Sequence, residues 1–215
     1  MAEDLTRALQ VGQRICWDET HGYHMRTGDG QGELNPDVDC SYFVGYCLQQ
    51  GGFNVSPSWN TGSMITTLRN YAGFTEYTWH PGFQLQHGDI LVYDEGGLDR
   101  GHTFFYVEDI YGYTSYGYNW DTASPHKEVL HTAIMEAAGK HNHPEIGDQD
   151  NGYGAHTEVW IHAYSDPSTS HTWYVYRWQA APGPIPPGPT PGHIPLWLLI
   201  KLSKHDRGGY YYGET

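Results

Sequence analysis

The segment Asp39-Cys40-Ser41 places a cysteine where an Asn-Pro-Asp turn at 35–37 gives way to a helix. A helix N-terminus presents backbone N–H groups without intrahelical acceptors and a partial positive charge, and both stabilise a thiolate. The same N–H groups can receive the oxyanion of a tetrahedral intermediate. The segment therefore predicts nucleophilic chemistry at Cys40, and Asp39 is expected to cap the helix.

A thiol nucleophile needs a base that is distant in sequence but adjacent in space. The candidate is His102, which follows a glycine at the start of a predicted strand. Because the chain has 14 histidines, a single histidine carries little information. The order of the motifs carries more: a cysteine at a helix start, Gly88-Asp89 before a strand, and Gly101-His102 at the start of the next strand.

Hydrophobic periodicity predicts the elements that position these residues. Apolar residues at helical spacing predict helices over 3–16, 40–50 and 63–71. Runs of β-branched and aromatic residues predict strands over 90–93, 102–107 and 174–178. Helices that precede antiparallel strands indicate an α+β domain, which we expect to cover residues 1–179.

The composition changes abruptly at Ala180. Seven of the 13 prolines lie between Pro182 and Pro195, which predicts an extended linker over residues 180–195. The tail, residues 196–215, opens with five apolar residues and continues with basic ones, and five residues are too few to cross a bilayer. We expect no transmembrane anchor. The tail either docks on a partner or membrane surface, packs on its own domain, or begins a second module.

Charge and cysteine content exclude several classes of protein. The 215 residues hold 11 Lys and Arg against 25 Asp and Glu, a net charge of −14, which argues against a nucleic-acid partner. Three cysteines without a CxxC motif do not form a disulfide framework, and Cys16 and Cys47 are expected in the core. No basic and apolar leader opens the chain, so we expect synthesis in a cytoplasm without a signal peptide.

Taken together, these motifs resemble the NlpC family of papain-like cell-wall cysteine peptidases, and more closely the endolysin-like phage peptidoglycan amidohydrolases. The matching segments cover most of residues 10–179 and are DCSYFVGYCLQQGG at 39–52, GDILVY at 88–93, GHTFFYV at 101–107, GDQ at 147–149 and WYVYRW at 173–178. The resemblance implies a papain-like NlpC fold with helices packed on a central antiparallel sheet.

The resemblance also implies roles for individual residues. Cys40 would be the nucleophile and His102 the base, while Glu136 would orient the imidazole. Residues 109–131 look like an insertion relative to the family, so His162 and Asn119 remain alternatives for the third role. Two further residues, Tyr23 and Ser41, are candidates for contacting the substrate or the oxyanion.

The activity that the resemblance implies is hydrolysis of an amide bond in bacterial peptidoglycan, by an endopeptidase or an N-acetylmuramoyl-L-alanine amidase. Such a protein would act at the bacterial cell wall as a phage lysin or a virion-associated lysin. The alternative is a non-catalytic wall-binding or phage tail structural protein on the same scaffold.

Two groups of histidines raise the possibility of a metal site. They are His21 with His24, and His141 with His143 near Glu145 and Asp148. Zinc hydrolases use three nitrogen or oxygen ligands and keep one position open. Neither group forms an HExxH motif, and both lie in Gly- and Pro-rich segments. We therefore expect solvated loop histidines, and neither a metal nor another cofactor.

Overall fold

The computed structural model describes residues 2–18, 22–23, 37–57, 59–96, 101–114, 127–139 and 157–180. The first half of this part of the chain forms three helices and two short strands, namely α1 (Leu5–Asp18), β1 (Gly22–Tyr23), β2 (Asp37–Val38), α2 (Cys40–Gln50) and α3 (Thr61–Asn70). The remaining strands are β3 (Phe74–Thr78), β4 (Ile90–Asp94), β5 (Gly101–Val107), β6 (Ile110–Tyr113), β7 (Lys127–Leu130), β8 (Ala133–Gly139), β9 (Thr157–Ala163) and β10 (Tyr174–Trp178). The α+β class is confirmed.

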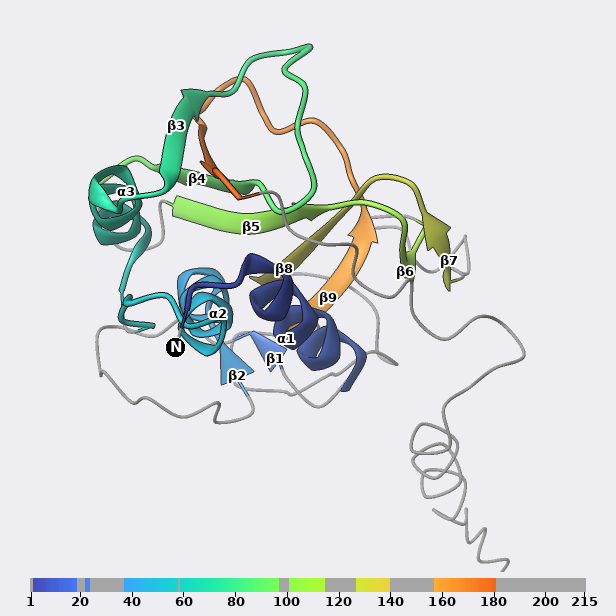
Figure 1. Ribbon diagram of the computed structural model, residues 1–215. Helices are drawn as coiled ribbons and strands as arrows, with labels where there is room; N and C mark the ends of the chain where they lie inside the picture. Colours follow the sequence, from blue (N-terminus) through green and yellow to red (C-terminus); the bar gives the residue numbers. More distant parts are fainter. Residues whose placement is uncertain are drawn as a thin grey trace, which may run out of the picture.

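One sheet contains the eight strands β3 to β10, in the order β3-β10-β4-β5-β8-β9-β6-β7. Its neighbouring strands are antiparallel, apart from β6 and β9, which pair in parallel through Tyr113 and His162. Helices α1 and α2 lie together beside β5 and β8, and α3 lies near β3 and β4 (Figure 1). The strands β1 and β2 form a separate parallel pair.

Helix α2 has the bounds that its sequence predicts. Asp39 adopts an extended conformation and accepts a hydrogen bond from the backbone N–H of Tyr42 at 2.6 Å, so it is the expected N-cap. Gly51 ends the helix, and its N–H donates to the carbonyl of Cys47. Most of the helix between these residues is buried, in keeping with its apolar composition.

Two other helices begin at positions that differ from the prediction. Helix α3 starts at Thr61 rather than residue 63, because Asn60 and Ser63 form a reciprocal capping box. Helix α1 starts at Leu5 rather than residue 3, since the carboxylate of Asp4 accepts from the N–H of Arg7 at 3.1 Å. In both cases a polar residue that caps the helix determines where it starts.

The sheet buries apolar side chains on both faces. Against the helices, Phe43 of α2 packs edge-on against Phe105 of β5, with ring centroids 6.3 Å apart. On the other face, Leu91 and Phe104 belong to a second cluster that includes Trp79 and Trp173. Burial on both faces explains why β4 and β5 are continuous apolar runs rather than alternating ones. Cys16 and Cys47 are buried in the core against the helices, as predicted.

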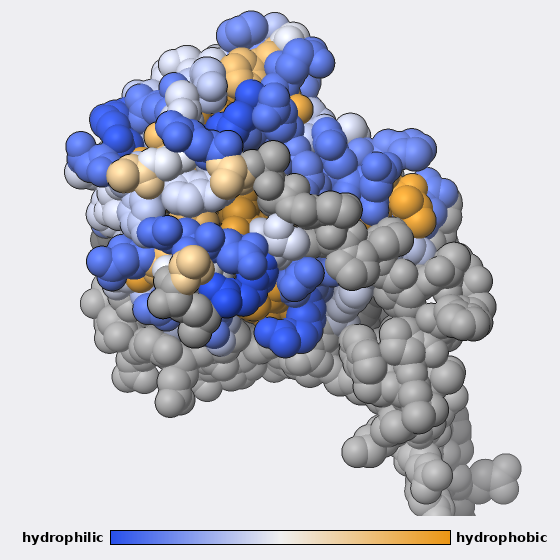
Figure 2. All heavy atoms as spheres, viewed as in Figure 1, coloured by the Kyte–Doolittle hydropathy of each residue, from blue (hydrophilic) through white to orange (hydrophobic). Residues whose placement is uncertain are grey.

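The predicted insertion at 109–131 includes β6 and β7, which pair from Ile110–Leu130 to Tyr113–Lys127. The predicted linker and tail lie outside the described residues, apart from Ala180. Within the described ranges, no helix is both long enough and apolar enough to cross a bilayer. On the face shown in Figure 2, hydrophobic residues form small areas among hydrophilic ones.

Candidate active site

Cys40 is the first residue of α2, and its surroundings fix the start of that helix. The hydroxyl of Ser41 lies 2.7 Å from the carbonyl oxygen of Trp59, and the indole N–H of Trp59 donates to the carbonyl of Ser41 at 2.7 Å. A side chain at Gly45 would collide with the Trp59 indole, so glycine allows this close packing. Trp59 therefore holds the helix end that carries Cys40.

His102 lies at the start of β5, directly opposite Tyr93 of β4. The glycine before it has a structural reason. A Cβ atom at Gly101 would collide with the hydroxyl of Thr61, the first residue of α3, and would lie 2.9 Å from the carbonyl oxygen of Tyr93. The Gly-His motif thus allows α3 to pack closely against the strand end that presents the imidazole.

The structure brings Cys40, His102 and Glu136 together. Cys40 acts on the His102 ring through its charge and a hydrogen bond, and the Nε2 atom of His102 lies 2.6 Å from Oε2 of Glu136. Since Nε2 faces Glu136, Nδ1 is the ring nitrogen left for the sulfur. The β5–β8 ladder runs from Val107–Ala133 to Phe105–Met135 and ends before His102, so the two strands separate where these side chains meet.

Glu136 is 3% exposed and lies on the opposite side of β8 from the core residues Met135 and Ala137. Three nitrogen atoms surround its carboxylate: Nε2 of His102 at 2.6 Å, Nε2 of His162 at 2.8 Å and Nε1 of Trp160 at 3.3 Å. Burial alone would raise the pKa of this carboxyl, but the two histidines hold it well below its usual value. Glu136 is therefore an ionised, buried hydrogen-bond acceptor.

The partners of His102 favour its protonated form. Burial acts to lower the pKa of the imidazole, but the charge of the Cys40 thiolate, its hydrogen bond to the ring, and the Glu136 carboxylate together raise it to about 10. An ionised carboxylate can only accept, so Nε2 of His102 must carry a proton. Glu136 thus fixes the ring so that Nδ1 faces Cys40.

This arrangement has the parts that acyl transfer requires. A thiol lies beside an imidazole, a buried carboxylate orients that imidazole, and the backbone N–H groups of Cys40 and Ser41 have no acceptor within α2. Those N–H groups are placed where an oxyanion formed next to the sulfur could be bound. The site can therefore support nucleophilic attack on a carbonyl carbon.

The structure describes only some of the other residues that the sequence predicts at the site. The Ser41 hydroxyl faces Trp59 and Asp39, the latter at 2.8 Å. The backbone of Tyr23 pairs with Val38, two residues before Cys40, but the side chain of Tyr23 lies outside the described part. Further predictions also fall outside it, namely Asn119, the GDQ segment at 147–149, and the histidine groups His21 with His24 and His141 with His143.

Sequence reasoning did not predict two neighbours of the site. Trp160 donates to the same Glu136 oxygen that His162 contacts, and the pairing of Glu136 with Trp160 across β8 and β9 brings it there. Tyr93 lies next to His102 in the sheet, and burial, Glu95 and the charge of Cys40 raise the pKa of its phenol. For Tyr93 the sequence signal was the predicted strand over 90–93, and for Trp160 it was the nearby His162, which was an alternative for the third role.

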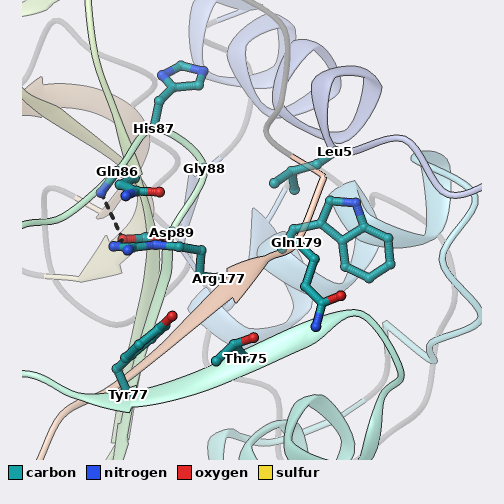
Figure 3. A pocket seen from close by; sticks show the side chains of 10 residues that line it. Leu5, Thr75, Tyr77, Gln86, His87, Gly88, Asp89, Arg177 and Gln179 are labelled. Atoms are coloured by element: carbon teal, nitrogen blue, oxygen red, sulfur yellow. Dashed lines mark hydrogen bonds and ion pairs between the residues drawn. The ribbon is translucent and has the colours of Figure 1, made fainter.

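A cavity of about 390 Å³ lies elsewhere, between the start of β4, the end of β10 and β3 (Figure 3). Its most polar feature is Arg177, which donates to Asp89 through Nε at 2.8 Å and through Nη2 at 2.7 Å. Because each charge neutralises the other, this pair offers little to an ionic ligand. None of Cys40, His102 and Glu136 lines the cavity.

The chain was also compared with known proteins. Neither a protein-family model nor a curated protein matches it. The interpretation of the site therefore depends on its geometry and on the motifs described above.

Proposed function

We propose that the protein is a cysteine hydrolase in which Cys40 is the nucleophile, His102 the general acid and base, and Glu136 the orienting residue. The observation that supports this most strongly is the continuous chain from the Cys40 sulfur through the His102 ring to the buried Glu136 carboxylate. Three separate elements, α2, β5 and β8, contribute one residue each. Such a convergence of thiol, imidazole and carboxylate is typical of activated nucleophiles.

The proposed reaction proceeds in two steps. The Cys40 sulfur attacks the carbonyl carbon of an amide, a C–S bond forms, and the His102 imidazolium protonates the nitrogen as the C–N bond breaks. Water then attacks the thioester and gives a proton to His102 while the C–S bond breaks, which releases a carboxylic acid. The second step restores both the Cys40 sulfur and the His102 imidazolium. Water is therefore the only reactant needed besides the amide.

The proposed substrate is bacterial peptidoglycan, and the proposed fold is the papain-like NlpC type. Both come from the resemblance of the Asp-Cys-Ser, Gly-Asp and Gly-His-Thr motifs to those of cell-wall peptidases and phage amidohydrolases. The bond would be a peptide bond of the stem or the amide that joins muramic acid to L-alanine. A lysin encoded by a phage, acting at the bacterial wall, is the biological role that fits this activity.

The test uses purified bacterial cell walls and follows their turbidity. Wild type is expected to clear the suspension, and Cys40→Ala is expected not to. Cys16→Ala is the matched control, since Cys16 is also a free, buried cysteine but lies in the core. Equal clearing by wild type and Cys40→Ala would exclude the thiol mechanism. If neither clears the walls but both bind them, the protein is a wall-binding or tail structural protein.

Mass spectrometry of the released fragments identifies the bond that is cut. A free muramoyl carboxyl group with a free L-alanine amine indicates the amidase, whereas a new amine and carboxyl group within the stem indicate the endopeptidase. Clearing that a chelator abolishes and iodoacetamide leaves intact would replace the thiol mechanism with metal-assisted hydrolysis.

A further inference from the structure

A second histidine contacts the carboxylate that orients His102. His162 of β9 is 1% exposed, and its Nε2 atom lies 2.8 Å from Oε1 of Glu136, while His102 occupies Oε2. The other ring nitrogen of His162, Nδ1, lies 2.9 Å from the carbonyl oxygen of Ala163. Both nitrogens of this buried ring therefore face oxygen atoms.

The protons of this cluster can be counted. A carbonyl oxygen is only an acceptor, so Nδ1 of His162 must carry a proton. Oε1 of Glu136 also receives the indole N–H of Trp160, and Oε2 receives Nε2–H of His102, so the carboxylate is already used as an acceptor on both oxygens. A neutral His162 would then turn an unprotonated Nε2 toward Oε1, leaving two acceptors opposed in a buried site.

We infer that His162 is an imidazolium that donates through both ring nitrogens and acts as a second positioning residue, with Glu136 bridging it to His102. Its ring centroid lies 4.4 Å from that of Trp160, a contact that favours a cation. Glu136 would thus hold two histidines in fixed orientations, one that reacts and one that does not.

Two other described groups near this cluster carry no charge. From α1, Cys16 interacts with Glu136, but burial raises the pKa of its thiol well above the usual value, so it stays neutral. From β6, Tyr113 pairs with His162 in the sheet and its ring lies 6.0 Å from that of Trp160. The charge that His162 contacts directly in this cluster is that of Glu136, which also contacts His102.

The charge of a protonated His162 would also affect the proposed thiol chemistry. This part of the argument rests on the proposed function. With His162 protonated, its charge balances that of Glu136 among the described groups, and the charge of His102 faces Cys40. With His162 neutral, Glu136 would leave a net negative charge beside the thiolate, and an uncompensated buried charge is costly. His162 would thus neutralise Glu136 so that His102 can release its proton to the leaving group.

The first test is a nitrogen NMR measurement on the full-length wild-type protein labelled with ¹⁵N-histidine, at neutral pH. The His162 ring is assigned by the signals that disappear in His162→Gln. We expect both ring nitrogens of His162 to be protonated. A ring with one unprotonated nitrogen would overturn the inference. The variant serves only for the assignment, and the protonation state is measured on the wild-type protein.

The second test measures how His162 acts on His102. In the Cys40→Ala background, His162→Gln keeps a donor toward Glu136 but removes the charge, so the titration midpoint of His102 is expected to rise by about one pH unit. His131→Gln is the matched control, because His131 pairs with Asp109 on the surface at 2.8 Å. An unchanged midpoint in His162→Gln would overturn the charge-balancing role.

These measurements use no peptidoglycan. A wild type that leaves cell walls intact would reject the proposed substrate and leave the assignment of His162 standing. Conversely, a neutral His162 in a protein that clears walls would reject the assignment and leave the proposed function standing.

Discussion

Replacing Glu136 with glutamine removes the negative charge of the carboxylate and keeps the size and shape of the side chain nearly the same. The carboxylate accepts from His102, His162 and Trp160, at 2.6, 2.8 and 3.3 Å. A glutamine has one acceptor oxygen and one NH₂ group. If the oxygen stays with His162 and Trp160, the NH₂ group faces the Nε2–H of His102, and two donors oppose each other.

The expected effects follow from this mismatch. Loss of one charge-assisted hydrogen bond and the buried unpaired donor are expected to lower the free energy of unfolding by about 3 kcal/mol. For a domain of this size, that corresponds to a decrease in Tm of about 6–12 °C. To avoid the opposed donors, His102 is expected to move its proton to Nδ1, which faces Cys40 and can then no longer accept the thiol proton. Replacement of an orienting carboxylate by an amide in this way is expected to lower kcat by about 10⁴-fold.

The assay is the initial rate of wall clearing, measured at a temperature at which circular dichroism shows the variant folded. Asp89→Asn is the matched control, since Asp89 is also a buried carboxylate and pairs with Arg177 away from the site. The control is expected to lose stability and keep its rate. If Glu136→Gln clears walls at a rate close to that of wild type, Glu136 does not orient His102, and His162 or Asn119 would take its place.

Further predictions concern the groups around Glu136. Cys40→Ala is expected to lower the pKa of His102 from about 10, because the thiolate charge and hydrogen bond are removed; an NMR titration with an unchanged midpoint would contradict the contact. The pKa of His102 is raised in the folded protein, so His102 stabilises the fold fully below its unfolded pKa of 6.5, and this stabilisation is lost as the pH rises through about 10. The Tm difference between wild type and His102→Gln should therefore shrink over that pH range. A Tm difference that grows would contradict the predicted direction. Asp39→Ala is expected to cost about 1 kcal/mol in urea unfolding through loss of the α2 cap, and wild-type stability would show that the cap is dispensable. Gly101→Ala is expected to displace His102 through its collision with Thr61 and so to slow wall clearing, whereas a normal rate would mean that the strand can shift without harm.

The sequence predicted best where the signals were local. Helix α2 was predicted correctly because its cap, its apolar residues and its glycine stop all lie within residues 39–52. Strand β8 was not predicted, since its sequence Ala-Ile-Met-Glu-Ala-Ala-Gly is rich in residues that favour helices. Its strand conformation comes from pairing with β5 on one side and β9 on the other, which is a tertiary effect.

The candidate site shows the same division. Cys40 and His102 stand in motifs that can be read directly, because a capped helix start and a Gly-His strand start are local features. The contacts of Glu136 with Trp160 and His162 depend on the register of β8 against β9, in which Glu136 pairs with Trp160. The register of two strands cannot be read from the sequence alone. The sequence therefore does not show that Trp160 and His162 both contact Glu136.

The measurement that tests the central claim most directly is the loss of wall clearing as iodoacetamide modifies the native protein, with the modified cysteine identified by peptide mass spectrometry. The account predicts that clearing falls in proportion to modification of Cys40, while Cys16 and Cys47 stay unmodified because burial raises the pKa of both thiols. Full modification of Cys40 with clearing unchanged would contradict it.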